Sequence, residues 1–159
     1  MSSYLLDTNA LIYYYEGDPL GRQVETLLRT STSRFWVTSL ALVEIRSALA
    51  RRVRDGDLTQ EGYWLVVKRF CYDISSMGRF NVQPLRRSFV PPCILMLEDY
   101  ALRQGFGLAT LDCLHLLAAL DLKGREPELH LVTADRALAN VAGRAGVPTL
   151  LLEPQDETE

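Results

Sequence analysis

The sequence predicts an α/β sandwich in which short strands form a mostly parallel sheet. Short apolar or β-branched segments alternate along the chain with longer segments whose apolar residues recur at helical spacing. Glycine, proline and aspartate stops separate these segments, and no internal repeat or low-complexity stretch interrupts them. Such alternation is typical of domains in which helices cover a mostly parallel sheet.

Five short segments are predicted as strands. The first ends at Asp7, the second contains Phe35 and Trp36 beside β-branched residues, and the last is expected at an edge of the sheet. These segments span residues 4–6, 34–38, 81–85, 129–133 and 149–152.

Seven segments are predicted as helices. Ser39 and Thr110 are placed to act as N-caps, and Pro91 and Pro92 suit a first helical turn because that turn needs no backbone donor. The stop Gly17-Asp18-Pro19 separates the first two helices. The seven segments span residues 10–15, 21–29, 40–54, 59–71, 91–104, 111–122 and 136–145.

The length and the end of the chain predict one domain with a short tail. A chain of 159 residues is long enough for one proper core. We expect residues 1–152 to form this domain. Residues 153–159 are acidic and almost without apolar side chains, so we expect them to be disordered.

The charge of the chain limits how it can meet nucleic acid. A formal net charge of −3 argues against a protein that coats nucleic acid in general. However, 15 of the 17 basic residues are arginine, whose planar fork suits phosphate oxygens. The clusters at Arg51-Arg52 and Arg86-Arg87 are therefore either solvated helix faces or a local surface for an anionic ligand.

Cysteine usage and hydropathy predict a cytoplasmic protein. Cys71, Cys93 and Cys113 are odd in number and form no Cys-x-x-Cys pair, which favours free thiols in a reducing compartment. No stretch approaches the roughly 20 apolar residues that a membrane helix needs. The amino terminus also lacks the features of a signal peptide.

Four acidic residues stand in apolar surroundings or at the ends of predicted strands. They are Asp7, Glu44, Asp112 and Asp135. In parallel α/β sheets, ligands bind beyond the carboxyl ends of the strands, and each of the four lies near such an end or in an early helical turn. Carboxylates that converge there would repel one another unless a cation compensates their charge. We therefore predict a carboxylate site for a divalent cation.

An oxygen-only site favours Mg²⁺ or Mn²⁺ over zinc, which prefers cysteine and histidine. Such ions polarise a phosphoryl oxygen and activate water, so the chemistry that fits best is hydrolysis of a phosphodiester bond. A carboxylate free of metal could act as the general base. Three of the acids also have an ordinary structural reading: Asp7 could start a turn, and Asp112 and Asp135 could be first-turn helix acids. Glu44 has the weakest structural reading, because its neighbours are apolar.

Other polar residues are candidates for supporting roles. Asn9 and Thr133 could orient carboxylates or water, although Thr133 could equally cap the last helix. His115 lies three residues after Asp112 on nearly the same helix face, so it could join the site or only pack beside it. Arg136 directly follows Asp135 and Arg46 lies two residues after Glu44, and both are candidate RNA contacts.

The segments around the four acids resemble a known family. Leu5-Leu6-Asp7-Thr8-Asn9, the run from Ser39 to Glu44, Leu111-Asp112 and Val132-Thr133-Ala134-Asp135 occur in the same order as in the PIN-domain ribonucleases. The nearest type is the VapC toxin of bacterial and archaeal toxin–antitoxin pairs. The resemblance covers nearly the whole chain, from Tyr4 to about Leu152.

The resemblance implies a PIN-like three-layer α/β/α sandwich and an endoribonuclease that depends on Mg²⁺ or Mn²⁺. Asp7, Glu44, Asp112 and Asp135 would be its acidic quartet. Asp7, Asp112 and Asp135 would hold metal, and Glu44 would act directly or through water. The resemblance further implies a homodimer, and inhibition by an antitoxin whose tail occupies the groove of the active site.

Other functions are compatible with part of the sequence. A PIN-type nuclease could process RNA outside a toxin pair, and a scaffold of the same fold could bind partners without catalysis. A receiver domain would need a lysine after a late strand, and neither Lys68 nor Lys123 is so placed. A haloacid-dehalogenase-type phosphatase would need Asp-x-Asp after the first strand, where this chain has Asn9.

Overall fold

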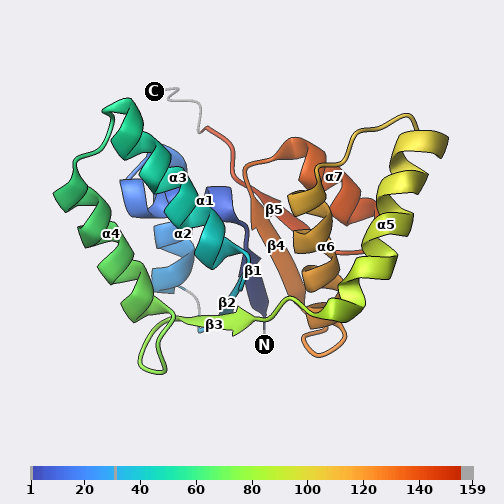
Figure 1. Ribbon diagram of the computed structural model, residues 1–159. Helices are drawn as coiled ribbons and strands as arrows, with labels where there is room; N and C mark the ends of the chain where they lie inside the picture. Colours follow the sequence, from blue (N-terminus) through green and yellow to red (C-terminus); the bar gives the residue numbers. More distant parts are fainter. Residues whose placement is uncertain (1, 31, 155–159) are drawn as a thin grey trace.

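A five-stranded parallel sheet forms the centre of the molecule in the computed structural model, which describes residues 2–30 and 32–154 (Figure 1). The order of the strands is β3-β2-β1-β4-β5, and every neighbouring pair is parallel. The strands are β1 (Ser3–Leu6), β2 (Arg34–Thr38), β3 (Phe80–Gln83), β4 (Leu129–Thr133) and β5 (Thr149–Leu151). The predicted edge position of the last strand is confirmed.

Helices cover both faces of this sheet. Alternate strand residues face opposite ways: Leu6 and Val132 join the core under the first helices, whereas Leu5 and Leu131 join the core under the last ones. The helices α1 to α4 therefore pack on one face and α5 to α7 on the other (Figure 1). This arrangement confirms the predicted three-layer α/β/α sandwich.

The helices differ from the prediction mainly at their ends. Their bounds are α1 (Thr8–Glu16), α2 (Pro19–Thr30), α3 (Ala41–Asp55), α4 (Gln60–Asp73), α5 (Val90–Glu98), α6 (Thr110–Lys123) and α7 (Arg136–Arg144). The helix predicted over residues 91–104 is divided into α5 and a π turn (Asp99–Arg103), and a 3₁₀ turn (Arg87–Phe89) precedes α5.

Two predicted N-caps are wrong. The backbone N–H of Ala41 donates a hydrogen bond to the hydroxyl of Thr38, at 3.1 Å, and not to the hydroxyl of Ser39. Ser39 instead accepts a bond from the N–H of Leu85, at 2.9 Å, because its side chain faces the segment after β3. Thr110 is the first residue of α6, and no side chain caps that helix.

The register of the sheet places three polar residues side by side. Leu6 of β1 pairs with Val37 on one side and Val132 on the other. The next residues along the three strands are therefore Asp7, Thr38 and Thr133. The carboxyl edge of the sheet thus carries one carboxylate between two hydroxyl groups.

The structure describes residues 153 and 154 of the predicted tail. Glu153 accepts a hydrogen bond from Gln23 through its backbone oxygen and forms an ion pair with Arg136, at 3.0 Å. Residues 155–159, on which the prediction of disorder mainly falls, lie outside the described residues. Within the described part of the chain, no helix has both the length and the apolar character needed to cross a membrane.

Candidate active site

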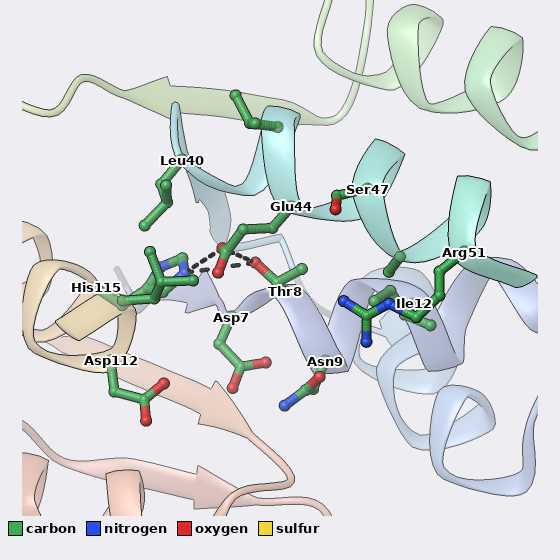
Figure 2. A pocket seen from close by; sticks show the side chains of 13 residues that line it. Asp7, Thr8, Asn9, Ile12, Leu40, Glu44, Ser47, Arg51, Asp112 and His115 are labelled. Atoms are coloured by element: carbon green, nitrogen blue, oxygen red, sulfur yellow. Dashed lines mark hydrogen bonds and ion pairs between the residues drawn. The ribbon is translucent and has the colours of Figure 1, made fainter. Parts of the chain in front are cut away.

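A pocket opens at the carboxyl edge of the sheet, between the amino-terminal parts of three helices (Figure 2). The end of β1 and the helix α1 form its floor, α3 forms one wall and α6 forms the opposite wall. Three of the four predicted acids line this pocket: Asp7, Glu44 and Asp112.

Asp7 is the most buried of these acids, with 4% of its surface exposed. Its Oδ1 accepts a hydrogen bond from the backbone N–H of Ala10 at 2.8 Å, so Asp7 is also the N-cap of α1. Its Oδ2 accepts a hydrogen bond from the hydroxyl of Thr133. Burial raises the pKa of Asp7 above its ordinary value, the charge of Asp112 adds to this rise, and the two hydrogen bonds only partly offset it.

Glu44 lies on α3 and accepts two hydrogen bonds at the same oxygen. The hydroxyl of Thr8 donates to Oε2 at 2.5 Å, and Nε2 of His115 lies 2.7 Å from the same atom. Burial by itself would raise the pKa of Glu44. The bonds from His115 and Thr8 outweigh that effect, so the pKa lies below its ordinary value.

Asp112 lies in the first turn of α6 and carries no hydrogen bond to the described residues. Its pKa is raised, first by burial and then by the negative charges of Asp135 and Glu44. Repulsion among the acids therefore acts on Asp112 directly. A cation in the pocket would relieve it.

Asp135 is the acid that the structure does not bring into the pocket lining. Its Oδ1 accepts hydrogen bonds from the N–H groups of Ala137, at 2.7 Å, and Leu138, at 3.0 Å, so it is the N-cap of α7. Asp135 therefore has a structural role, although as the cap of α7 and not as the first-turn acid of the structural reading. Its charge still reaches the site, since it raises the pKa of Asp112.

The two predicted supporting residues take different places. Thr133 is fully buried, donates to Asp7 and accepts a bond from the backbone N–H of Asp135 at 3.0 Å. It therefore links two of the acids. Asn9 lines the pocket from the first turn of α1.

The predicted RNA contacts do not lie in the pocket. The guanidinium of Arg46 contacts Sγ of Cys71 on α4, at 3.2 Å, and Arg136 pairs with Glu153 outside the pocket. Arg51, which the sequence did not single out within its cluster, does line the pocket (Figure 2). It follows Glu44 by seven residues, or about two helical turns. The helical period therefore places Arg51 on the same face of the helix as Glu44, which could have identified it from the sequence.

Sequence reasoning assigned no role to Thr8 and left the role of His115 open. Thr8 follows Asp7 directly, and nothing in its sequence context marks it as a partner of Glu44. His115, for which the sequence left a site role and a packing role open, lies in the pocket and contacts Glu44.

The donor set fits a hydrated magnesium or manganese ion. Among the residues that the structure describes, no group of three or more histidine, cysteine, aspartate or glutamate side chains is placed to hold one ion together. Mg²⁺ usually keeps several waters and binds through one or two carboxylates, a number that the pocket acids could supply.

A three-layer sandwich that gathers acids at the carboxyl edge of a parallel sheet defines a class, the α/β proteins with an acidic site at that edge. Comparison of the sequence with protein families is more specific. The PIN domain family model matches residues 4–144, and the chain belongs to this family. The resemblance stated from the sequence is thereby confirmed. PIN domains are generally nucleases, which supports a hydrolase acting on nucleic acid.

Solved structures share this fold at low sequence identity. The VapBC2 complex from Rickettsia felis, bound to a DNA fragment from its promoter, contains a chain with a TM-score of 0.65 and 14% identity, covering 95% of this chain and 99% of that one. PAE2754 from Pyrobaculum aerophilum has a TM-score of 0.57 and 17% identity, with 93% and 83% covered. A domain of a functionally unknown protein from Methanocaldococcus jannaschii has a TM-score of 0.53 and 14% identity, with 100% and 96% covered. No curated protein matches the sequence.

Proposed function

We propose that the protein is a divalent-metal-dependent endoribonuclease and the toxin of a toxin–antitoxin pair. The observation that carries the nuclease is the pocket in which Asp7, Glu44 and Asp112 meet. Two of these acids have raised pKa values, partly because of their mutual repulsion. Membership of the PIN domain family supports the same reaction.

Each acid has a role that follows from its contacts. Asp7 and Asp112 would hold Mg²⁺ or Mn²⁺, with Asp135 at the border of the site as a third donor. When bound, the ion would polarise a phosphoryl oxygen and lower the pKa of a bound water. Glu44 has one oxygen fixed by Thr8 and His115, and Oε1 carries no bond to the described residues. Oε1 would orient the attacking water.

Cleavage of RNA tests this proposal. The purified protein is incubated with a labelled RNA that contains single-stranded regions, in Mn²⁺, Mg²⁺ or chelator. We expect cleavage that needs the cation and disappears in Asp7→Asn, which keeps the size of the side chain but removes its charge. Asp55→Asn is the matched control, because Asp55 is exposed at the end of α3 and pairs with its neighbour Arg54.

Metal binding is measured on the same samples by calorimetry. If the wild type neither cuts RNA nor binds Mn²⁺, the nuclease proposal is overturned and a non-catalytic scaffold of the same fold becomes the better explanation. Cleavage without any effect on cell growth would instead favour an RNA-processing nuclease outside a toxin pair.

The rim of the pocket supports the proposed antitoxin. Val43 on α3 and Leu111 on α6 are exposed, at 67% and 45%, on opposite sides of the acids. A partner segment with apolar side chains and an arginine would match this combination. The VapBC2 complex, which has the same fold, favours such a pair.

Expression in cells tests the toxin role. We expect the wild type to arrest growth, Asp7→Asn to be harmless, and co-expression of the adjacent gene to restore growth. The Val43→Glu variant should escape that partner, because it introduces an unpaired charge on the covered rim. Normal growth with an active enzyme would contradict the toxin role.

The proposed compartment is the cytoplasm. Cys71 is exposed, Cys93 and Cys113 are buried, and all three are free thiols, as suits a reducing environment. Cell fractionation with an antibody checks this. Recovery of the protein outside the cytoplasm would contradict it.

A further inference from the structure

The buried ring of His115 joins the two walls of the pocket (Figure 2). His115 belongs to α6 and is 3% exposed. Its Nε2 lies 2.7 Å from Oε2 of Glu44 on α3, and its Nδ1 lies 3.2 Å from Oγ1 of Thr38. Elsewhere α3 packs against α1 and α4, whereas α6 packs against α5 and β4, so this contact links two separately supported walls.

The hydrogen bonds around the ring determine which nitrogen donates. Oγ1 of Thr38 accepts the N–H of Ala41 and also lies within hydrogen-bond distance of Nδ1 of His115, so the hydroxyl is a partner for that nitrogen. An ionised carboxylate can only accept. Nε2 must therefore carry the proton that bonds Glu44. Both ring nitrogens therefore have a polar partner, and Nε2 is the one that donates to Glu44.

Thr8 completes the arrangement by donating to the same oxygen. Its hydroxyl lies 2.5 Å from Oε2 of Glu44 and 3.4 Å from Nε2 of His115, so its single hydrogen goes to the nearer carboxylate. Two donors from two elements hold Oε2. A glutamate side chain without such partners would sample several rotamers, at a cost in catalytic alignment.

We propose that His115 is a positioning residue of the nuclease, which donates from Nε2 to Glu44 and thereby leaves Oε1 of Glu44 aligned for the water that attacks the phosphodiester. This inference rests on the proposed function. The ring reaches the reaction through Glu44 and does not itself contact RNA or metal. A histidine that only filled space would not need both nitrogens matched to polar groups of the pocket.

The position of the ring proton is a direct test that does not depend on activity. The chain has two histidines, so long-range proton–nitrogen spectra of the histidine-labelled protein are simple, and His130→Gln assigns them. We expect the Nε2 of His115 to be protonated. In Glu44→Gln we expect the Nε2 resonance to shift. An unprotonated Nε2, or a spectrum indifferent to Glu44→Gln, would overturn the inference.

Kinetics test the consequence of that contact. We expect His115→Leu to lower kcat by roughly tenfold to a hundredfold while KM changes little, as is typical when a residue that orients a site group is lost. His115→Gln, which retains a side-chain donor, should recover part of the loss. His130→Gln is the control, since His130 lies in β4 against Tyr4, outside the pocket.

A double-mutant cycle separates positioning from general damage. If His115 acts through Glu44, His115→Leu costs little in a Glu44→Gln background. Losses that multiply independently would overturn the proposal. If the wild type neither cleaves RNA nor binds Mn²⁺, the nuclease proposal fails, whereas the wild-type spectrum still decides whether His115 donates to Glu44. That spectrum needs no substitution of the buried ring, so the test survives if His115→Leu does not fold.

Discussion

Asp7 has one role in the fold, which stabilises the protein, and one role in the site, which destabilises the protein when no metal is bound. As N-cap of α1 it satisfies the backbone of Ala10, which stabilises the helix. As a buried charge near Asp112 it destabilises the metal-free protein, and burial raises its pKa. Asparagine caps helices about as well but carries no charge. Asp7→Asn therefore isolates the cost of the charge.

We predict that metal-free Asp7→Asn becomes more stable than the wild type as pH rises from about 4 to neutrality. For a group whose pKa is raised in the folded state, the stabilisation is fully present below the unfolded pKa and is lost as pH rises through the folded pKa. Only the wild type loses it. The direction of the difference follows from the raised pKa of Asp7, and the difference should grow as pH rises to neutrality.

Urea unfolding at several pH values, with chelator present, measures this difference. Added Mn²⁺ should stabilise the wild type and leave Asp7→Asn unchanged. Asp55→Asn should follow the wild-type curve. Parallel stability curves for Asp7→Asn and the wild type would show that the charge of Asp7 is not costly.

We predict that Arg51→Ala weakens RNA binding. The number of counterions released on binding, measured from the salt dependence of the affinity, should fall by about one, as expected for the loss of a single phosphate contact. Arg51 lines the pocket and has no ion pair among the residues described. Arg46 and Arg136, proposed from sequence, are measured beside it by fluorescence anisotropy in an Asp7→Asn background.

Arg29→Ala is the control for Arg51→Ala, since Arg29 lies on α2 and pairs with Glu25 on its own helix. Equal affinity of Arg51→Ala and this control would exclude Arg51 from the RNA surface. A larger loss for Arg46→Ala than for Arg51→Ala would place the RNA over α4 instead of over the pocket.

At the scale of elements, the close packing of α1 against α2 positions the floor of the pocket. Gly21 of α2 is buried, and a Cβ atom there would lie 2.1 Å from the carbonyl oxygen of Tyr13 in α1. That contact involves backbone, so no side chain can turn aside to relieve it. Because α1 begins directly after Asp7, its position also sets that of Thr8 and Asn9.

We predict that Gly21→Ala destabilises the protein by about 1–3 kcal/mol, the usual cost of overpacking. Gly143→Ala is the matched control, because Gly143 lies exposed in α7 with open space around it. That change should stabilise the helix by about 0.5–1 kcal/mol. Thermal and urea unfolding measure the stability of both variants. If Gly21→Ala changed the stability as Gly143→Ala does, α1 and α2 could separate without cost.

At the scale of the whole molecule, the apolar outer surface of α5 supports the proposed homodimer. Val90, Ile94 and Leu95 are 52%, 51% and 67% exposed, and Leu102 in the following π turn is 82% exposed. The sequence of α5 carries no charge before Glu98. A second copy could therefore cover this surface without desolvating a charge.

We predict that the protein is a dimer in solution and that Leu95→Glu converts it to a monomer, because the new carboxylate would be buried without a partner. Light scattering after size exclusion, over a range of concentrations, measures the mass. Met77→Glu is the control, since Met77 is 81% exposed and lies outside α5. A Leu95→Glu variant that keeps the mass of the wild type would contradict this interface.

The sequence by itself determined the class of the fold and most of the acidic site. The alternation of strands and helices predicted the parallel sandwich, because side-chain period and stop signals are local properties of the chain. Asp7, Glu44 and Asp112 were identified because carboxylates in apolar surroundings are costly without compensation. These predictions needed no knowledge of which segments are neighbours.

Only the tertiary structure decided which side chains meet. The strand order placed Asp7 between Thr38 and Thr133, and the packing of α6 opposite α3 brought His115 to Glu44. In the structure, Arg46 contacts Cys71 of α4, and one carboxylate oxygen of Asp135 caps α7. Such contacts join residues far apart in the chain, and they depend on sheet order and helix rotation, which local spacing does not encode.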